Sequence, residues 1–384
     1  MIPYGCQDVD DSDLEAVVTA LKSDFLTQGP RVPEFENAVS GYCSAQFATA
    51  VNSATSALHI ACLALDVGPA DLVWTSPISF VASANCALYC GAKVDFVDVD
   101  PTTGNMSVSA LAEKLARAKS ENALPKVVIP VHLCGESCDM AGIGRLAKSY
   151  GFRVIEDASH AIGATCGSRA VGACEHSDIV VFSFHPVKII TSAEGGMVVT
   201  NDADLHSKLQ MLRSHGVTRD PDLMAWPADG PWSYQQVSLG FNYRLTDLQA
   251  ALGTSQLKRI SHFIDRRHEL ADRYDELLGN MEVQPLLRNQ FGQSSLHLYV
   301  VLLDDGFVPS RRQVFEKMRS GGVGVNIHYI PIHTQPYYQE LGFSVGMFPG
   351  SEAYYARAIT LPLHPKLSLE DQNRVVELLG EALN

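Results

Sequence analysis

The sequence predicts an α/β fold, with a large domain built on a mostly parallel β-sheet and a smaller α+β domain after it. Two observations predict this fold. Short apolar segments alternate with helical segments up to about residue 200, which is typical of a parallel sheet with helices on both faces. From about residue 261 long charged helices dominate, and 384 residues are too many for one small core. We therefore expect domains at residues 1–260 and 261–384.

The expected elements follow this pattern in order. Strands of the large domain are expected at residues 47–51, 72–75, 93–99, 126–131, 153–157, 178–184 and 196–200, with helices between the first five. The smaller domain is expected to hold helices at 262–278, 311–319 and 371–383 and a strand at 297–302. The segment 220–232 is rich in Pro, Asp and Trp, which indicates an irregular loop, and residues 225–232 within it are a candidate lid over the substrate. Ligands of such sheets bind at the carboxyl ends of the strands.

The composition argues against several classes of function. A net charge of -14 argues against nucleic acid or an anionic membrane as the main partner. The chain has no apolar run of about 18 residues to span a membrane, and no basic region followed by an apolar stretch at its start. Nine scattered cysteines indicate free thiols in a reducing cytoplasm.

Lys188 and Asp157 carry the strongest chemical signal. Asp157 ends one apolar strand, and Lys188 follows another that ends near Ser183. Pyridoxal 5'-phosphate needs this pair, because the lysine forms a Schiff base with its aldehyde and the acid keeps its ring nitrogen protonated. A lone lysine after a strand is usually a solvated surface residue, so the pairing with Asp157 decides the interpretation. We interpret both residues as catalytic.

Residues 52–56, Asn-Ser-Ala-Thr-Ser, form a turn from a strand into a helix. Free backbone N–H groups at such a helix start favour an anion. Plain N-capping by Ser53 explains the same residues. Beside Lys188 and Asp157 we favour a phosphate site, to which Ser183 adds a hydroxyl.

Two nearby residues have open interpretations at this point. Phe80 either stacks on an aromatic cofactor ring or belongs to the core. His160 either contacts a cofactor oxygen or is a structural histidine. The pairs Cys134/Cys138 (with His132) and His328/His333 are weak signals for a metal, and we predict no metal site.

Six motifs occur in the order found in one family of proteins. They are residues 24–30 (Asp-Phe-Leu-Thr-Gln-Gly-Pro), 52–58, 156–161 (Glu-Asp-Ala-Ser-His-Ala), 182–188, 194–196 (Glu-Gly-Gly) and 240–247 (Gly-Phe-Asn-Tyr-Arg-Leu-Thr-Asp). The chain resembles the DegT/DnrJ/EryC1/StrS sugar aminotransferases over nearly its whole length. The resemblance implies the pyridoxal phosphate-dependent fold type I, as in aspartate aminotransferase, for the large domain.

The resemblance also implies roles for individual residues. Lys188 would be the Schiff-base lysine and proton shuttle, Asp157 the partner of the ring nitrogen, and His160 a neighbour of a cofactor oxygen, so that all three would be catalytic. Phe80 would stack on the ring, while Ala54, Thr55 and Ser183 hold the phosphate. Asn242 would reach the phosphate of the partner subunit, which implies a homodimer. The residues implied to border the sugar nucleotide are Tyr4, Leu26, Thr27, Gln28, Gly29, His328, Tyr329, Ile330 and Pro331.

Within the family, residues 184–188 and 325–331 are most similar to those of the pseudaminic acid pathway members, which commonly carry Pro where this chain has Ile189. This similarity implies amination at C4 of a UDP-linked 4-keto-6-deoxy-N-acetyl-L-altrosamine, with L-glutamate as donor. A perosamine or 4-amino-arabinose type aminotransferase is an alternative, and so is a regulator that binds the cofactor without turnover. Related sugar dehydratases carry His in place of the lysine, so Lys188 argues against that reaction.

Overall fold

A seven-stranded sheet forms the centre of the computed structural model, which describes residues 1–304 and 310–384. Its strands lie in the order β1-β9-β8-β5-β4-β2-β3. Their bounds are β1 Phe47–Val51, β2 Leu72–Thr75, β3 Lys93–Phe96, β4 Val127–Ile129, β5 Arg153–Asp157, β8 Ile179–Ser183 and β9 Gly196–Thr200. Strand β9 runs antiparallel to β1 and β8, and the other neighbouring pairs are parallel. The predicted mostly parallel sheet is confirmed.

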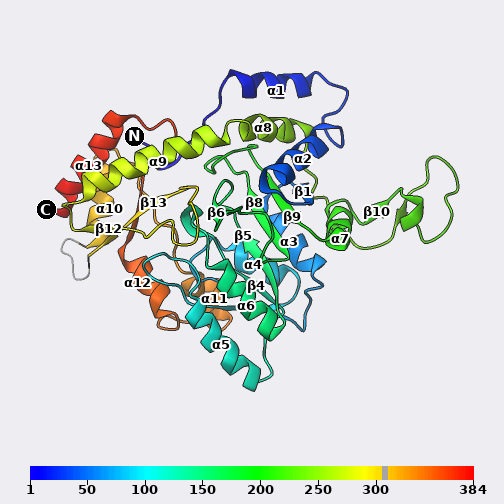
Figure 1. Ribbon diagram of the computed structural model, residues 1–384, viewed down its shortest axis with the longest axis horizontal. Helices are drawn as coiled ribbons and strands as arrows, with labels where there is room; N and C mark the ends of the chain where they lie inside the picture. The colour runs from blue at the N-terminus through cyan, green and yellow to red at the C-terminus, as the bar shows by residue number, and fades with distance from the viewer. Residues whose placement is uncertain (305–309) are drawn as a thin grey trace.

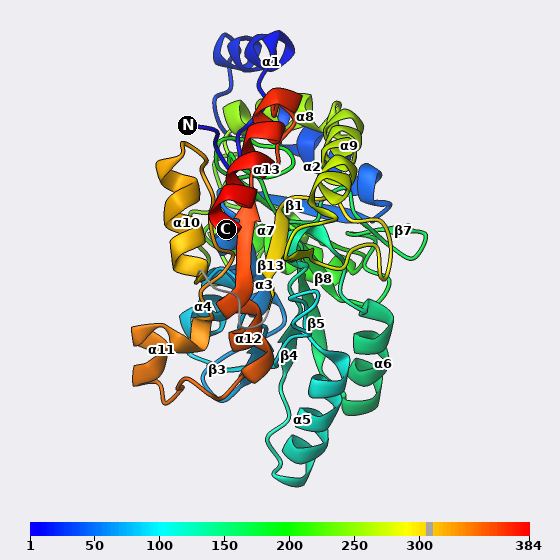
Figure 2. The same ribbon diagram turned by 90° about the vertical axis from the view of Figure 1, so that its left-hand side faces the viewer.

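Helices cover both faces of this sheet (Figures 1 and 2). Side chains of a strand point alternately to the two faces, so Val181 of β8 packs toward one core and its neighbour Phe182 toward the other. One face is covered by α3 Ala54–Ala64, α4 Ala82–Tyr89 and α7 Ala203–Arg213. The other is covered by α2 Arg31–Cys43, α5 Val108–Ser120, α6 Met140–Tyr150, α8 Asp247–Leu257 and the start of α9 Ile260–Leu278. Helix α1 Asp11–Leu21 lies on α8.

A second, antiparallel sheet joins β12 Val283–Pro285, β13 Tyr299–Leu303 and β14 Ala358–Leu361. Helices α10 Arg311–Ser320 and α13 Leu369–Leu383 share its core, and α11 Pro336–Glu340 and α12 Pro349–Arg357 complete the C-terminal part. Helix α9 contributes Phe263 to the core of the large sheet and Tyr274 to that of the small sheet. The exact boundary at residue 260 therefore stays a prediction.

The described residues also contain two pairs of short antiparallel strands. Strands β6 Thr165–Cys166 and β7 Arg169–Ala170 form one, and β10 Val217–Thr218 and β11 Gln235–Gln236 form the other. The segment 220–232, which was predicted to be irregular, lies between β10 and β11. It is irregular apart from a 3-10 turn at Pro221–Leu223. It belongs to an arm that projects away from the body (Figure 1). None of the helices in the described residues has the length and apolar character needed to cross a membrane.

Gly196 has no side chain and lets strand β9 lie close to the backbone at the start of helix α3. It is paired with Val51 of β1 and with Ser183 of β8. A Cβ atom added to Gly196 would lie 2.5 Å from the carbonyl oxygen of Ser53 and 2.7 Å from the amide nitrogen of Ala54. Both obstacles are backbone, so the helix start itself would have to move.

We predict that Gly196→Ala lowers the free energy of unfolding by about 1–3 kcal/mol, the usual cost of overpacking. Gly41→Ala is the matched control, because no atom lies within 4 Å of a Cβ added there and Gly41 lies inside α2. That substitution is expected to stabilise the protein by about 0.5–1 kcal/mol. Urea unfolding of the three proteins measures both effects. An unchanged midpoint for Gly196→Ala would show that the close approach does not exist.

Candidate active site

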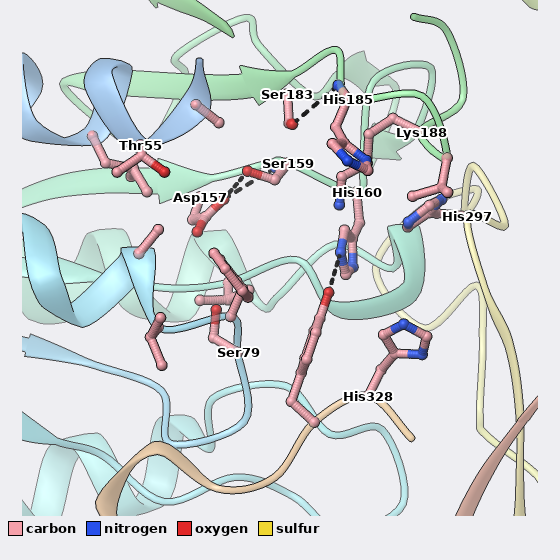
Figure 3. A pocket seen from close by; sticks show the side chains of 18 of the residues that line it. Thr55, Ser79, Asp157, Ser159, His160, Ser183, His185, Lys188, His297 and His328 are labelled. Carbon is pink, nitrogen blue, oxygen red and sulfur yellow. Dashed lines mark hydrogen bonds between the residues drawn. The ribbon is translucent and has the colours of Figure 1, made fainter. Parts of the chain in front are cut away.

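A cavity of about 650 Å³ opens where several parallel strands of the main sheet end. Asp157 is the last residue of β5 and Ser183 the last of β8, and both line the cavity. Helix α3 contributes its first residues, and the C-terminal part contributes His297 and His328 from the opposite side (Figure 3). The site thus lies between the carboxyl ends of the main sheet and loops of the C-terminal part.

Most residues predicted from the sequence line this one cavity. They are Tyr4, Ala54, Thr55, Phe80, Asp157, His160, Ser183, Lys188, His328, Tyr329 and Ile330. The individual roles assigned to them stay predictions. The residues that do not line it within one chain are Leu26, Thr27, Gln28, Gly29, Pro331 and Asn242.

The segment 26–29 lies instead against the start of α8. Thr27 forms a β-bridge with Thr246, and the backbone N–H of Gly29 donates to a carboxylate oxygen of Asp247 at 2.9 Å. Asn242, four residues before Thr246, is exposed to solvent. The arm segment 225–232 also contributes nothing to the cavity of its own chain, so the predicted lid is not seen within one subunit.

The start of helix α3 has backbone N–H groups that could bind an anion. Ser53 is the N-cap, and its hydroxyl accepts from the backbone N–H of Ser56 at 3.1 Å. The N–H groups of Ala54 and Thr55, the first helical residues, have no intrahelical partner. They line the cavity together with the hydroxyl of Ser183. Capping and anion binding are therefore compatible here, because Ser53 satisfies one N–H group and leaves others free.

Lys188 is half-buried and lies in the cavity wall with the buried Asp157. Burial lowers the pKa of Lys188 to about 8, although the nearby Asp157 favours the charged form. The carboxylate of Asp157 is 4% exposed and accepts hydrogen bonds from Ser83 and Ser159. A lysine with this pKa exists near neutral pH both as a cation and as a free amine, as proton transfer requires.

Both ring nitrogens of His160 have protein partners. Its Nδ1 accepts from the backbone N–H of Cys134 at 3.3 Å, and its Nε2 lies 3.1 Å from the hydroxyl of Tyr329. Burial and the charge of Lys188 hold the pKa of His160 well below its usual range. The ring is therefore neutral, with its proton on Nε2 and donated to Tyr329.

Two further histidines next to Lys188 are also neutral. Burial, with the charge of Lys188, lowers the pKa of His328 to about 3, and its Nδ1 lies 2.8 Å from the hydroxyl of Thr360. The pKa of His297 is likewise well below its usual range, chiefly through burial. His297 lies 4.4 Å from His160 between ring centres and was not predicted from the sequence, because no motif surrounds it.

The residues of the weak metal signal have other partners. His132 is buried, with its Nε2 2.7 Å from Glu156, and its Nδ1 accepts from the backbone N–H of Cys138. His333 pairs with Glu352 at 3.0 Å. Within residues 1–304 and 310–384 no group of three or more His, Cys, Asp or Glu side chains could hold a metal ion.

The donor set of the cavity fits pyridoxal phosphate. A helix start provides N–H groups for a phosphate, a buried carboxylate provides an acceptor for a ring N–H group, and Lys188 provides an amine. Phe80, 60% exposed, presents its ring at the cavity wall.

Comparison with known proteins agrees with this geometry. Residues 7–380 match the DegT/DnrJ/EryC1/StrS aminotransferase family. A Campylobacter jejuni protein named UDP-4-amino-4,6-dideoxy-N-acetyl-beta-L-altrosamine transaminase is 38% identical over 384 residues, which covers 100% of this chain and 98% of the relative.

Solved structures are similar over the whole chain. PseC from Helicobacter pylori, an aminotransferase involved in the biosynthesis of pseudaminic acid, has a TM-score of 0.90 and 33% identity over 100% of this chain and 99% of its own. A putative sugar aminotransferase from Streptococcus pneumoniae in its PMP form has a TM-score of 0.90 and 29% identity, with the same coverage. The chain therefore belongs to the DegT/DnrJ/EryC1/StrS aminotransferase family.

Proposed function

We propose that the protein transfers the amino group of L-glutamate to C4 of a UDP-linked 4-keto-6-deoxy-N-acetyl-L-altrosamine, as a pyridoxal phosphate-dependent transaminase of pseudaminic acid biosynthesis. The observation that carries this proposal is the convergence of Lys188, Asp157 and the α3 anion site in one cavity. Two full-length relatives named as this transaminase, at 37% and 38% identity, support the choice of sugar.

Each side chain has a defined task in this reaction. Bound pyridoxal phosphate supplies an aldehyde that takes up the amino group and a ring that accepts electrons. Lys188 would hold the cofactor through its Nζ and, as a free amine, would move the substrate proton. Asp157 would accept the ring N–H group, and the start of α3 with Ser183 would bind the phosphate. Phe80 would contact the ring, and the neutral His328 with Tyr329 would border the sugar.

The proposal includes a homodimer in which Asn242 completes the site of the partner subunit. Asn242 is exposed and does not line its own cavity. Large apolar side chains on or next to the β10–β11 arm are exposed as well, among them Trp232 at 70% and Leu239 at 77%. Exposed apolar surface of this kind is typical of an interface. Because Thr27 is bridged to Thr246, segment 26–29 would accompany Asn242 to that interface.

A cytoplasmic location is part of the same proposal. All nine cysteines are free thiols. Structural disulfides are typical of oxidising compartments, so a chain rich in unpaired cysteines suits a reducing one.

The first prediction concerns Lys188 and the sugar. Lys188→Ala should abolish amination, because Lys188 is the only lysine among the described residues that lines the cavity and could hold the cofactor and move the proton. The exposed Lys93→Ala is the control and should retain full activity. Mass spectrometry would follow glutamate-dependent amination of a panel of keto sugar nucleotides of the altrosamine, perosamine and 4-amino-arabinose types. Amination of another sugar alone would replace the proposed substrate, and an active Lys188→Ala would refute the role of the lysine.

The second prediction concerns Asn242 in the partner subunit. Mixing inactive Lys188→Ala with Asn242→Ala subunits, after dissociation and reassociation, should restore about a quarter of the unaltered activity, because half of the dimers are hybrids with one intact site. If Asn242 acted within its own chain, every site of the mixture would keep one defect. No recovery of activity above the Asn242→Ala level would then be seen.

The third prediction concerns pH. Acylation of Lys188 in the cofactor-free protein by a small reagent should speed up as the pH rises through about 8, because only the uncharged amine reacts. At pH 7 the free-amine fraction should exceed that of a lysine in a model peptide by about 200-fold. Peptide mass spectrometry of timed samples gives the rate at Lys188. A rate that still climbs tenfold per unit above pH 9 would contradict the lowered pKa.

A further inference from the structure

The carboxylate of Asp157 is fixed at both of its oxygen atoms. Ser159 donates to Oδ1 from its hydroxyl at 2.6 Å and from its backbone N–H at 3.1 Å. The hydroxyl of Ser83 donates to Oδ2 at 2.6 Å. Ser159 is two residues from Asp157 and makes a common local contact, whereas Ser83 comes from α4, which is 74 residues away in sequence. Figure 3 shows the local contact between Ser159 and Asp157.

The direction of the bonds behind Ser83 follows from counting hydrogens. A serine hydroxyl has one hydrogen, and an ionised carboxylate only accepts. Ser83 gives its hydrogen to Asp157 at 2.6 Å rather than to the carbonyl of Phe80 at 3.3 Å. The hydroxyl of Ser79, 2.6 Å from that of Ser83, must therefore be the donor in that pair. The result is a chain of hydroxyls from Ser79 through Ser83 to Asp157.

This chain leaves Asp157 one free acceptor position. A carboxylate has about four lone-pair sites. Two on Oδ1 are taken by Ser159 and one on Oδ2 by Ser83, so the remaining site is on Oδ2. Rotation of a carboxylate about its last bond is otherwise soft, so contacts to Oδ1 alone would not fix where Oδ2 points.

We propose that Ser83, supported by Ser79, is a positioning residue that holds Oδ2 of Asp157 toward the cofactor ring. Ser83 is fully buried and does not line the cavity, so it acts only through Asp157. The inference rests on the proposed use of pyridoxal phosphate. It does not depend on which sugar is aminated.

The chain offers a matched control for this inference. Ser76, just after β2, is also fully buried, but its hydroxyl has no hydrogen-bond partner. Ser76→Ala removes the same atoms from a similar depth without touching Asp157. Ser79→Ala tests the outer member of the chain.

The experiment measures the dissociation constant of pyridoxal phosphate and the visible circular dichroism of the bound cofactor. Ser83→Ala should weaken binding about 10- to 100-fold, the range for losing a hydrogen bond to a charged group, and should change the dichroism. Ser79→Ala should weaken it only a few-fold, at about the worth of a neutral hydrogen bond. Ser76→Ala should match the unaltered protein. Equal binding by Ser83→Ala and Ser76→Ala would overturn the inference.

A double variant separates positioning from general packing. If Ser83 acts through the charge of Asp157, then adding Ser83→Ala to Asp157→Asn should change cofactor binding less than twofold. A loss as large as in the native background would overturn the inference. If Ser83→Ala does not fold, Ser83→Cys replaces it throughout, because the weak thiol donor nearly keeps the volume. Failure of the unaltered protein to bind pyridoxal phosphate would refute the proposed function itself.

Discussion

The placement of Lys188 beside the buried carboxylate of Asp157 in one cavity is the interaction on which the rest of the site depends. The nearby Asp157 favours the charged form of the lysine. Desolvation nevertheless prevails, and the pKa of Lys188 falls to about 8. The carboxylate of Asp157 in turn accepts hydrogen bonds from hydroxyl and backbone donors, as a buried polar group requires.

Burial, reinforced by the charge of Lys188, explains why three histidines near it are neutral. Burial and the ammonium group together disfavour protonation of His160, His297 and His328. Neutral rings can accept and donate single hydrogen bonds without attracting an anion. The backbone N–H groups without an intrahelical partner are instead at the start of α3. The cavity thus has these N–H groups in one part of its wall and neutral histidines in another.

Residues that follow strands could be predicted from the sequence, because a parallel sheet brings the carboxyl ends of its strands together. Asp157, Ser183 and residues 54–55 were found in this way. Strand lengths were less well predicted. The segments 93–99 and 126–131 stay apolar beyond Phe96 and Ile129, where the strands end, because the following residues are buried as loops. An apolar sequence indicates that a segment is buried. Where the strand ends depends on the length of the neighbouring strand with which it pairs, which the sequence of the segment does not show.

Residues held by long-range packing carried no such signal. Ser83 lies inside an ordinary small-residue helix, and only the meeting of α4 with β5 gives its hydroxyl a partner. His297 lies in the loop before β13, and Arg267 fixes its backbone by donating to its carbonyl oxygen at 3.1 Å. Arg267 also donates to the carbonyl oxygens of Leu296 and Leu363. It therefore ties α9 to two loops near the cavity.

The contacts of Arg267 affect how substrate specificity can vary in this fold. The groups that fit the cofactor come from the large sheet and its helices, whereas His297, His328 and Tyr329 come from the C-terminal part. A change in the two loops that Arg267 contacts would shift the cavity wall at His297 and leave Lys188, Asp157 and the start of α3 in place. Substrate choice depends on small differences in such contacts. The two sets of residues meet where His160 contacts Tyr329, but different parts of the fold position them. The C-terminal wall of the cavity can therefore vary while the residues at the strand ends stay in place.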